Sequence, residues 1–273
     1  QAYDARYEGA AGFFASAALE GARLADQRWD LEFTQASGRL RYSQAGVSAE
    51  ELSVRYEGEV GSLSLAVGGH TSSEQRLVEA SLRGRFGVAP LLARVEVLEP
   101  LAGRITGDAD MVVGLRVPQL PDGSAGTAML SVRSDLQGVD LDLPAPLRKR
   151  PRVALPLRVD VALPVEAAEL QVRLGGLAHL RGRLDERNGL VGMLALGQPA
   201  ESLPDATTLS ILGQVAVLDA AGWAGLAREA LAGGGDPEAG RGTRVGELDV
   251  FAGQLDLLDR AFIETRLRLE PTA

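Results

Sequence analysis

The sequence predicts a mostly β protein, a long, twisted antiparallel sheet curled around an apolar groove, with one short helix near 219–232. Three observations support this fold class. Apolar and polar residues alternate along most of the chain, which is the period of a strand with one buried face. Glycine (33 residues) and proline (13 residues) punctuate the alternating runs and favour turns there. A single segment, 218–235, has helical spacing instead.

The alternating runs indicate about 14 to 18 short strands, a range that reflects how poorly one sequence fixes strand ends. In the amino-terminal part they lie at 40–42, 52–56, 63–67, 78–86, 95–97 and 111–117. In the later part they lie at 139–143, 155–163, 170–174, 194–196, 209–217, 255–257 and 263–269. Aromatic residues make up only 4% of the chain, so the apolar faces consist mainly of Leu, Val and Ala.

The segment 134–164 contains the most regular alternation in the chain. Its odd-numbered positions 155–163 are all aliphatic, whereas Arg158 and Asp160 fall on the opposite face. Pro144 and Pro146 mark the crossing between two strands. We expect the aliphatic faces to line the groove, through Met111, Val113, Leu115, Val139, Leu141, Leu143, Leu155, Leu157, Val159, Val161, Leu163, Leu209, Ile211, Val215 and Val217.

The predicted helix lies in the segment "LDAAGWAGLAREALAGGG", residues 218–235. Asp219 is a plausible N-cap, and the glycines from Gly233 onward end the helix. Its apolar stripe comprises Trp223, Leu226, Ala227, Ala230 and Leu231. Trp223 either packs against the sheet, which is the favoured interpretation, or lines a ligand site. Residues 233–243 are rich in turn formers and predict a flexible loop.

A chain of 273 residues is long enough for one large domain or two small ones. We expect a single continuous β-groove segment over 1–273, with amino-terminal strands in 1–130 and further strands plus the helix in 131–273. The net charge of −9 disfavours nucleic acid and anionic membrane surfaces as partners. No cysteine is present, which excludes disulfides and thiolate metal sites. The sequence contains no export signal and no apolar run long enough for a membrane helix, and we expect it to be an internal piece of a longer protein.

Candidate catalytic and metal-ligating residues are few. His70 and His179 are not spaced to share a metal ion, and a packing or surface role is favoured for both. The pairs Asp108 with Asp110 and Asp140 with Asp142 place two carboxylates on one strand face, where they could serve acid/base chemistry or be solvated. We favour solvation, and the sequence nominates no catalytic residue, metal or cofactor.

Two further patterns have alternative interpretations. Glycines 233, 234, 235, 240 and 242 follow a helix rather than a strand, which argues against a phosphate-binding loop. The basic cluster Arg148, Lys149, Arg150 and Arg152 either keeps a loop soluble, as we favour, or meets a lipid phosphate at the groove edge.

Three segments resemble a known family. They are "SVRSDLQGVDLDLPAPLRK" (131–149), "LGQVAVLDAAGWAGLA" (212–227) and "ELDVFAGQLDLLDRAFIETRLRLEPTA" (247–273). These resemble recurrent elements of the YhdP-like proteins, members of the AsmA-like group of the Gram-negative envelope. The resemblance covers about 131–273. It implies an inner-membrane-anchored protein with a periplasmic β-sheet rod that carries phospholipid between the inner and outer membranes, and it implies no catalytic residues.

The sequence and the resemblance together predict a non-enzymatic lipid conduit. A groove shelters an acyl chain because each buried methylene contributes about 0.8 kcal/mol. The expected partners are phospholipid acyl chains, the remainder of the parent chain at both ends, and envelope proteins at either membrane. The alternative is a structural or chaperone-like β scaffold that assists outer-membrane protein assembly through its strand edges.

Overall fold

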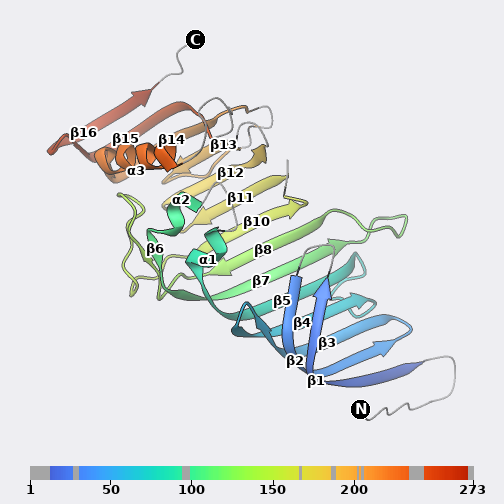
Figure 1. Ribbon diagram of the computed structural model, residues 1–273. Helices are drawn as coiled ribbons and strands as arrows, with labels where there is room; N and C mark the ends of the chain where they lie inside the picture. Colours follow the sequence, from blue (N-terminus) through green and yellow to red (C-terminus); the bar gives the residue numbers. More distant parts are fainter. Residues whose placement is uncertain are drawn as a thin grey trace. The chain divides into compact units, whose positions relative to one another are not determined.

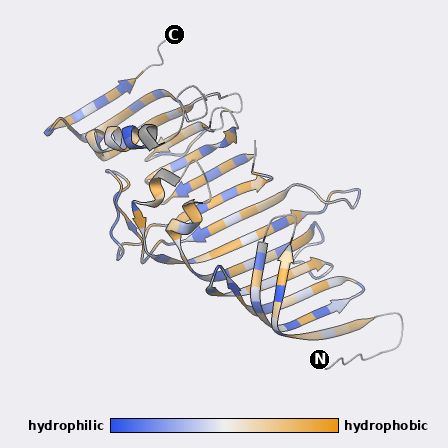
Figure 2. Ribbon diagram, in the orientation of Figure 1, coloured by the Kyte–Doolittle hydropathy of each residue, from blue (hydrophilic) through white to orange (hydrophobic). Residues whose placement is uncertain are grey.

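The computed structural model describes residues 13–26, 31–93, 99–165, 168–185, 189–201, 203, 206–233 and 243–269. Strands predominate in this part of the chain, and the predicted mostly β class is confirmed. Figure 2 shows hydrophilic and hydrophobic residues alternating along many of these strands. The run expected at 95–97 lies outside the described residues, as does most of the loop expected at 233–243.

The described residues form 16 strands and three helices, labelled in Figure 1. The strands of the first half are β1 (Phe14–Asp26), β2 (Leu31–Ser43), β3 (Gly46–Tyr56), β4 (Glu59–Gly68), β5 (Arg76–Gly87), β6 (Ile105–Thr106), β7 (Asp108–Pro118) and β8 (Ala128–Ser134). Those of the second half are β9 (Asp140–Leu141), β10 (Leu157–Leu163), β11 (Glu169–Leu174), β12 (Ala178–Asp185), β13 (Gly189–Leu196), β14 (Leu209–Asp219), β15 (Val245–Leu257) and β16 (Arg260–Leu269). The helices are α1 (Val88–Ala93), α2 (Glu99–Ala102) and α3 (Ala220–Gly233).

Fourteen of the strands belong to one sheet, in the order β1-β2-β3-β4-β5-β7-β8-β10-β11-β12-β13-β14-β15-β16. β6 and β9 form a separate two-stranded sheet. In the described part of the chain β1 and β16 are the two edges of the large sheet, so it is not closed into a barrel. The chain divides into two compact units, which we describe separately.

The first unit comprises Gln1–Phe86 and Asp110–Val132. Its strands β1 to β5 form an antiparallel meander, as the alternation predicts. Leu52, Leu63 and Leu82 are cross-strand partners on one face, and each is at most 8% exposed. The ring of Tyr56 contacts those of Phe33 and Phe86, with centroids 5.6 and 6.3 Å apart. The apolar face of the meander is therefore packed across its strands.

The second unit comprises Gly87–Ala109 and Arg133–Ala273. Its strands β10 to β13 are antiparallel, but β13 pairs with β14 in parallel, and β14 pairs with β15 in parallel. The sequence predicted a predominantly antiparallel sheet, and these two parallel pairs depart from that pattern. β14 and β15 are parallel because α3 connects them, and a crossover of this kind returns the chain in the same direction. The connection between β13 and β14 lies in residues 197–208, whose described part contains no helix.

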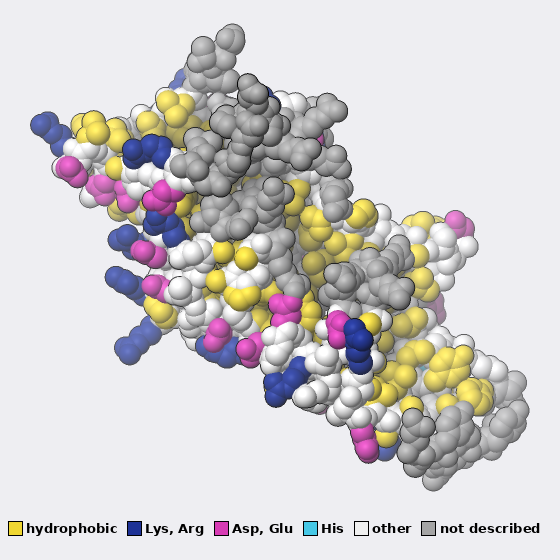
Figure 3. All heavy atoms as spheres, viewed as in Figure 1, with side chains coloured by type: hydrophobic (Ala, Val, Ile, Leu, Met, Phe, Trp, Pro, Cys, Tyr) yellow, Lys and Arg dark blue, Asp and Glu magenta, His cyan; other side chains and the backbone are white. Residues whose placement is uncertain are grey.

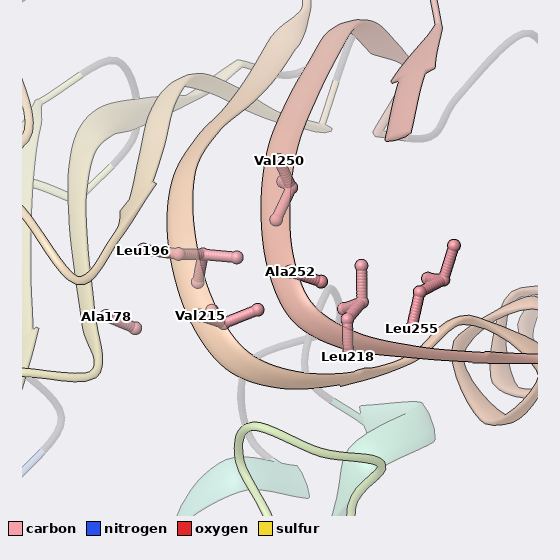
Figure 4. Packing of buried hydrophobic residues seen from close by; sticks show 7 residues of the cluster. All are labelled: Ala178, Leu196, Val215, Leu218, Val250, Ala252 and Leu255. Atoms are coloured by element: carbon pink, nitrogen blue, oxygen red, sulfur yellow. The ribbon is translucent and has the colours of Figure 1, made fainter. Parts of the chain in front are cut away.

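A core cluster stabilises the carboxyl-terminal end of this unit. Its buried members are Ala178, Leu196, Val215, Leu218, Val250, Ala252 and Leu255. Figure 4 shows the members from β14 and β15 on the inner side of the bend that these two strands make. Ala252 is 0% exposed and Val250 is 1% exposed. Helix α3 lies beside β14 and β15 (Figure 1) and contacts β15, and its residues Ala220 and Trp223 pack against the cluster.

Candidate functional site

Two rows of apolar residues cross the seven strands β10 to β16 on one face of the second unit. In each row, every residue is the direct cross-strand partner of the next. The first row, here called the open row, comprises Val159, Val172, Leu180, Leu194, Ile211, Leu248 and Leu269. The second, the covered row, comprises Leu157, Leu174, Ala178, Leu196, Gly213, Val250 and Leu267.

The row between them faces the other side of the sheet and is largely polar. It comprises Arg158, Arg173, His179, Ala195, Leu212, Asp249 and Arg268. The guanidinium of Arg266 donates to both carboxylate oxygens of Asp249, at 2.6 and 2.7 Å. The hydrogen bond from Arg266 lowers the pKa of the Asp249 carboxyl from its usual value. The alternation predicted from the sequence thus gives an apolar face and a charged face.

The two apolar rows differ in exposure. Ala178, Leu196 and Val250 of the covered row are buried, at 6%, 5% and 1% exposed. Every residue of the open row is at least half-buried but not fully covered, except Leu269, which is exposed. Figure 3 shows hydrophobic side chains at the surface in patches, with charged side chains projecting along the margin. Leu194, Ile211 and Leu248 of the open row also pack against the core cluster. The open row is therefore more exposed than the covered row, but part of it belongs to the packed core.

Helix α3 lies over the covered row, together with residues 143–149, here called the docking segment. The carbonyl oxygen of Ala145 accepts hydrogen bonds from Trp223 Nε1 at 2.9 Å and from the backbone N–H of Asp219 at 3.2 Å. Leu147 and Trp223 both pack against the core cluster. Packing was the favoured sequence interpretation for Trp223, and these contacts agree with it.

The start of α3 is fixed by the predicted cap. Asp219 Oδ1 accepts a hydrogen bond of 2.7 Å from the backbone N–H of Gly222. This bond satisfies one of the N–H groups that the first turn of a helix leaves without a partner. A side chain at Gly222 would collide with the Asp219 carboxylate, so the glycine belongs to the cap.

Lys149 differs from the rest of the basic cluster. Its side chain is only 5% exposed, and Nζ donates to the carbonyl oxygens of Val139 at 2.7 Å and Arg150 at 3.1 Å. Burial lowers the pKa of its ammonium group, and the charges of Asp140 and Asp135 oppose that change. Arg148, Arg150 and Arg152 are exposed. The cluster is therefore three surface arginines and one structural lysine that donates to two carbonyl groups, of which that of Val139 is buried.

None of the expected groove residues is exposed. The buried ones are Met111, Val139, Leu141, Leu143, Leu155, Val161, Leu209 and Val215, and the half-buried ones are Val113, Leu115, Leu157, Val159, Leu163, Ile211 and Val217. Val159 and Ile211 lie in the open row, and Leu157 lies in the covered row. Leu141 lies elsewhere, because β9 pairs with Ile105 of β6 and hydrogen bonds to Lys149 instead of joining the large sheet.

The candidate polar residues have mainly structural surroundings. His70 Nε2 lies 2.7 Å from Ser43 Oγ, and His179 Nε2 lies 3.4 Å from the carbonyl oxygen of Gly175. Asp110 is largely exposed, and its Oδ2 lies 3.8 Å from Arg85 Nη1. Within the described ranges, no three His, Asp or Glu side chains gather in a way that could hold a metal ion.

A comparison with protein-family models identifies the family of the chain. The family model described as YhdP protein matches residues 7–273, which is nearly the whole chain. The chain belongs to the YhdP family. No curated protein and no solved structure matches this YhdP-family chain. None of the described helices has the length and apolarity that a membrane span requires.

The structure explains the segments that carry the family resemblance. In "LPAPLRK", Leu143 and Pro144 are buried, Ala145 accepts the hydrogen bond of Trp223, Leu147 packs against the core cluster, and Lys149 satisfies carbonyl groups. In "LDAAGW", Asp219 caps the helix that Trp223 anchors. The two YhdP-like elements therefore contact each other in the fold.

Sequence reasoning missed several residues of the rows. Leu180, Leu194 and Leu248 were not among the expected groove residues, although Leu194 lies in an expected strand. The signal was available, because an aliphatic residue at every second position of neighbouring strands becomes a row once the strands are paired in register. The register itself could not be derived from one sequence.

Proposed function

We propose that this chain is part of a non-enzymatic lipid conduit of the cell envelope, in which acyl chains move along the open row between the inner and outer membranes. One observation carries the proposal, namely that seven successive strands place an aliphatic residue in the same row. Membership of the YhdP family supports it, and the absence of a metal cluster from the described residues is compatible with it.

The dimensions of the open row suit an acyl chain. Seven strands at about 4.8 Å spacing give a row about 29 Å long. One leaflet of a bilayer has a hydrocarbon thickness of about 15 Å, so the row is long enough to shelter a full acyl chain along its length. Sheltering 16 carbons is worth on the order of 10 kcal/mol at about 0.8 kcal/mol per methylene. A row of this length supplies that shelter without a break, because each member is the direct partner of the next.

Photo-crosslinking at neighbouring positions tests the proposal. Val159 belongs to the open row, whereas Asp160 faces the opposite side and pairs with Gln171. A photo-reactive residue at 159, and separately at 160, is placed in the full-length protein in cells, and covalent phospholipid adducts are measured by mass spectrometry. We expect adducts at 159 and few at 160. Equal labelling at both positions, or none at either, would overturn the conduit.

A second pair of positions guards against local damage. Leu180 lies in the open row two strands away, and Arg181 faces the polar side. The same contrast is expected there.

Val159→Asp should block lipid passage because an unpaired carboxylate beside acyl chains costs several kcal/mol. Asp160→Asn should be nearly silent, and thermal melting of both variants shows whether the strand remains folded.

A further inference from the structure

A pocket of about 270 Å³ opens beside α3 in the second unit. It is lined on one side by Leu143 and Pro144 of the docking segment and on the other by Leu226 of α3. The same two elements present Leu147 and Trp223 to the core cluster. The docking segment and α3 therefore contact the apolar core and also line this pocket. The volume of the pocket is close to the lower end of the range for small-molecule sites, about 300 Å³.

The rim of the pocket carries charges of both signs. Arg104 Nη2 lies 2.6 Å from Glu229 Oε2, and Arg148 Nη2 lies 3.7 Å from Asp142 Oδ1, which is too long for a hydrogen bond. The backbone N–H of Asp142 donates to the carbonyl oxygen of Arg104 at 2.9 Å, which holds the two ion pairs side by side. Asp219 also lines the pocket but is engaged in the helix cap.

The four charged side chains pair with one another and are at least 36% exposed. A ligand that carries both charges matches this arrangement. A lone anion would compete with Glu229 and Asp142 for the guanidinium groups and would add negative charge to a rim that already has three carboxylates. A lone cation would compete with the arginines for the carboxylates. A zwitterion lying across the two ion pairs gives each charge an opposite neighbour.

Gly225 forms part of the pocket wall. It lines the pocket in the interior of α3, where glycine destabilises a helix relative to alanine. A Cβ built at this position meets no atom within 4 Å, and its φ is not in the left-handed region. Neither packing nor backbone conformation therefore requires glycine here. Its effect is to keep the wall of the pocket open.

We propose that this pocket binds a zwitterionic phosphate headgroup of the phosphoethanolamine type. The phosphate oxygens bind the guanidinium groups of Arg104 and Arg148, which suit the planar, bidentate recognition of phosphate. The ammonium group binds the carboxylates of Asp142 and Glu229. The lipid origin of the headgroup rests on the proposed conduit function, whereas a free phosphate zwitterion shares the same chemistry.

Calorimetric titration of the purified protein tests the site. The probes are glycerophosphoethanolamine, which has no acyl chains, inorganic phosphate and ethanolamine. We expect the zwitterion to bind at least about tenfold more tightly than either fragment, which corresponds to about 1.4 kcal/mol. Gly225→Met fills the pocket and should abolish binding, whereas the matched control Gly225→Ala keeps most of the space. Failure of the zwitterion to bind, equal binding of phosphate alone, or unchanged binding by Gly225→Met would overturn the proposal.

The source of the headgroup is distinguished by co-purified lipid. If the ligand is a phospholipid, Gly225→Met should lower the share of phosphatidylethanolamine relative to phosphatidylglycerol extracted with the protein. An unchanged share, with loss of soluble ligand binding, would overturn the lipid source. Because the soluble probe has no acyl chain, its binding does not depend on the open row. The failure of the conduit and the failure of this site are therefore separate outcomes.

Discussion

Trp223 anchors α3 to the sheet through a hydrogen bond and through packing, and the two contributions can be separated. In Trp223→Phe a smaller aromatic ring keeps most of the packing, but the bond from Nε1 to the Ala145 carbonyl is lost. That carbonyl still accepts from the Asp219 N–H, so no acceptor is left unsatisfied. We therefore expect a loss of only about 1 kcal/mol in the free energy of unfolding.

Trp223→Ala also removes the ring that packs against the core cluster. Complete truncation of a buried aromatic residue costs about 3–5 kcal/mol, and the half-buried position of Trp223 places the expected loss near 3 kcal/mol. Since each kcal/mol shifts the melting temperature of a domain of this size by about 2–4 °C, the alanine variant should melt about 6–12 °C lower.

Urea unfolding followed by far-ultraviolet circular dichroism measures both variants without relying on the tryptophan signal. The reasoning predicts the order wild type, Phe, Ala in stability. Equal destabilisation by Phe and Ala would mean that packing of the ring contributes nothing. An alanine variant less than about 1 kcal/mol below wild type would mean that α3 does not dock through Trp223.

Three further outcomes are expected. Asp219→Ala removes the cap of α3 and should cost about 1 kcal/mol in urea unfolding, whereas Asp219→Asn should retain most of the stability; equal losses would contradict the cap. Gly213→Ala should strongly destabilise the fold in thermal melting, because φ is +139° and a Cβ would overlap with the backbone of β13; a wild-type melting temperature would refute the parallel pairing of β13 with β14. The pKa of Asp249 is lowered by Arg266, so this pair stabilises the fold at neutral pH and its contribution is lost as the pH falls below about 4. Asp249→Asn should weaken that pH dependence in unfolding measured from pH 6 to pH 3, and an unchanged acid profile would contradict it.

Much of the sheet could be predicted because its strands have one apolar face. The run from Leu155 to Leu163 contains β10, and its odd and even positions do face opposite sides. The helix from Ala220 to Gly233 could be predicted from its spacing, its cap and its terminal glycine. These features depend only on residues close together in the sequence, which is why one sequence reveals them.

The parallel pairs could have been recognised from two signals. β13 has the sequence "GLVGMLAL", an almost unbroken apolar run, which is typical of a strand buried on both faces. Val191 and Ala195 on one face and Leu196 on the other are all at most 5% exposed. In addition, a strand followed by a helix and another strand favours a parallel pair. A search for alternating apolar and polar residues alone detects neither signal.

The burial of Lys149 could not be predicted from the sequence. Three arginines surround it within residues 148–152, and a basic run of this kind usually lies on the surface. Its burial depends on the positions of the carbonyl groups of Val139 and Arg150, which are set by the turn around β9. That arrangement is tertiary, and no local pattern encodes it.

The two kinds of strand connection differ in how they respond to mechanical tension. In a hairpin such as β10–β11, a pull on the two outer ends opens the ladder one hydrogen bond at a time from one end. In β14 and β15 the outer ends lie at opposite ends of a parallel pair, so the same pull loads the whole ladder at once, in shear. Under tension applied through the two ends of the chain, the hairpins would therefore open before the crossover through α3.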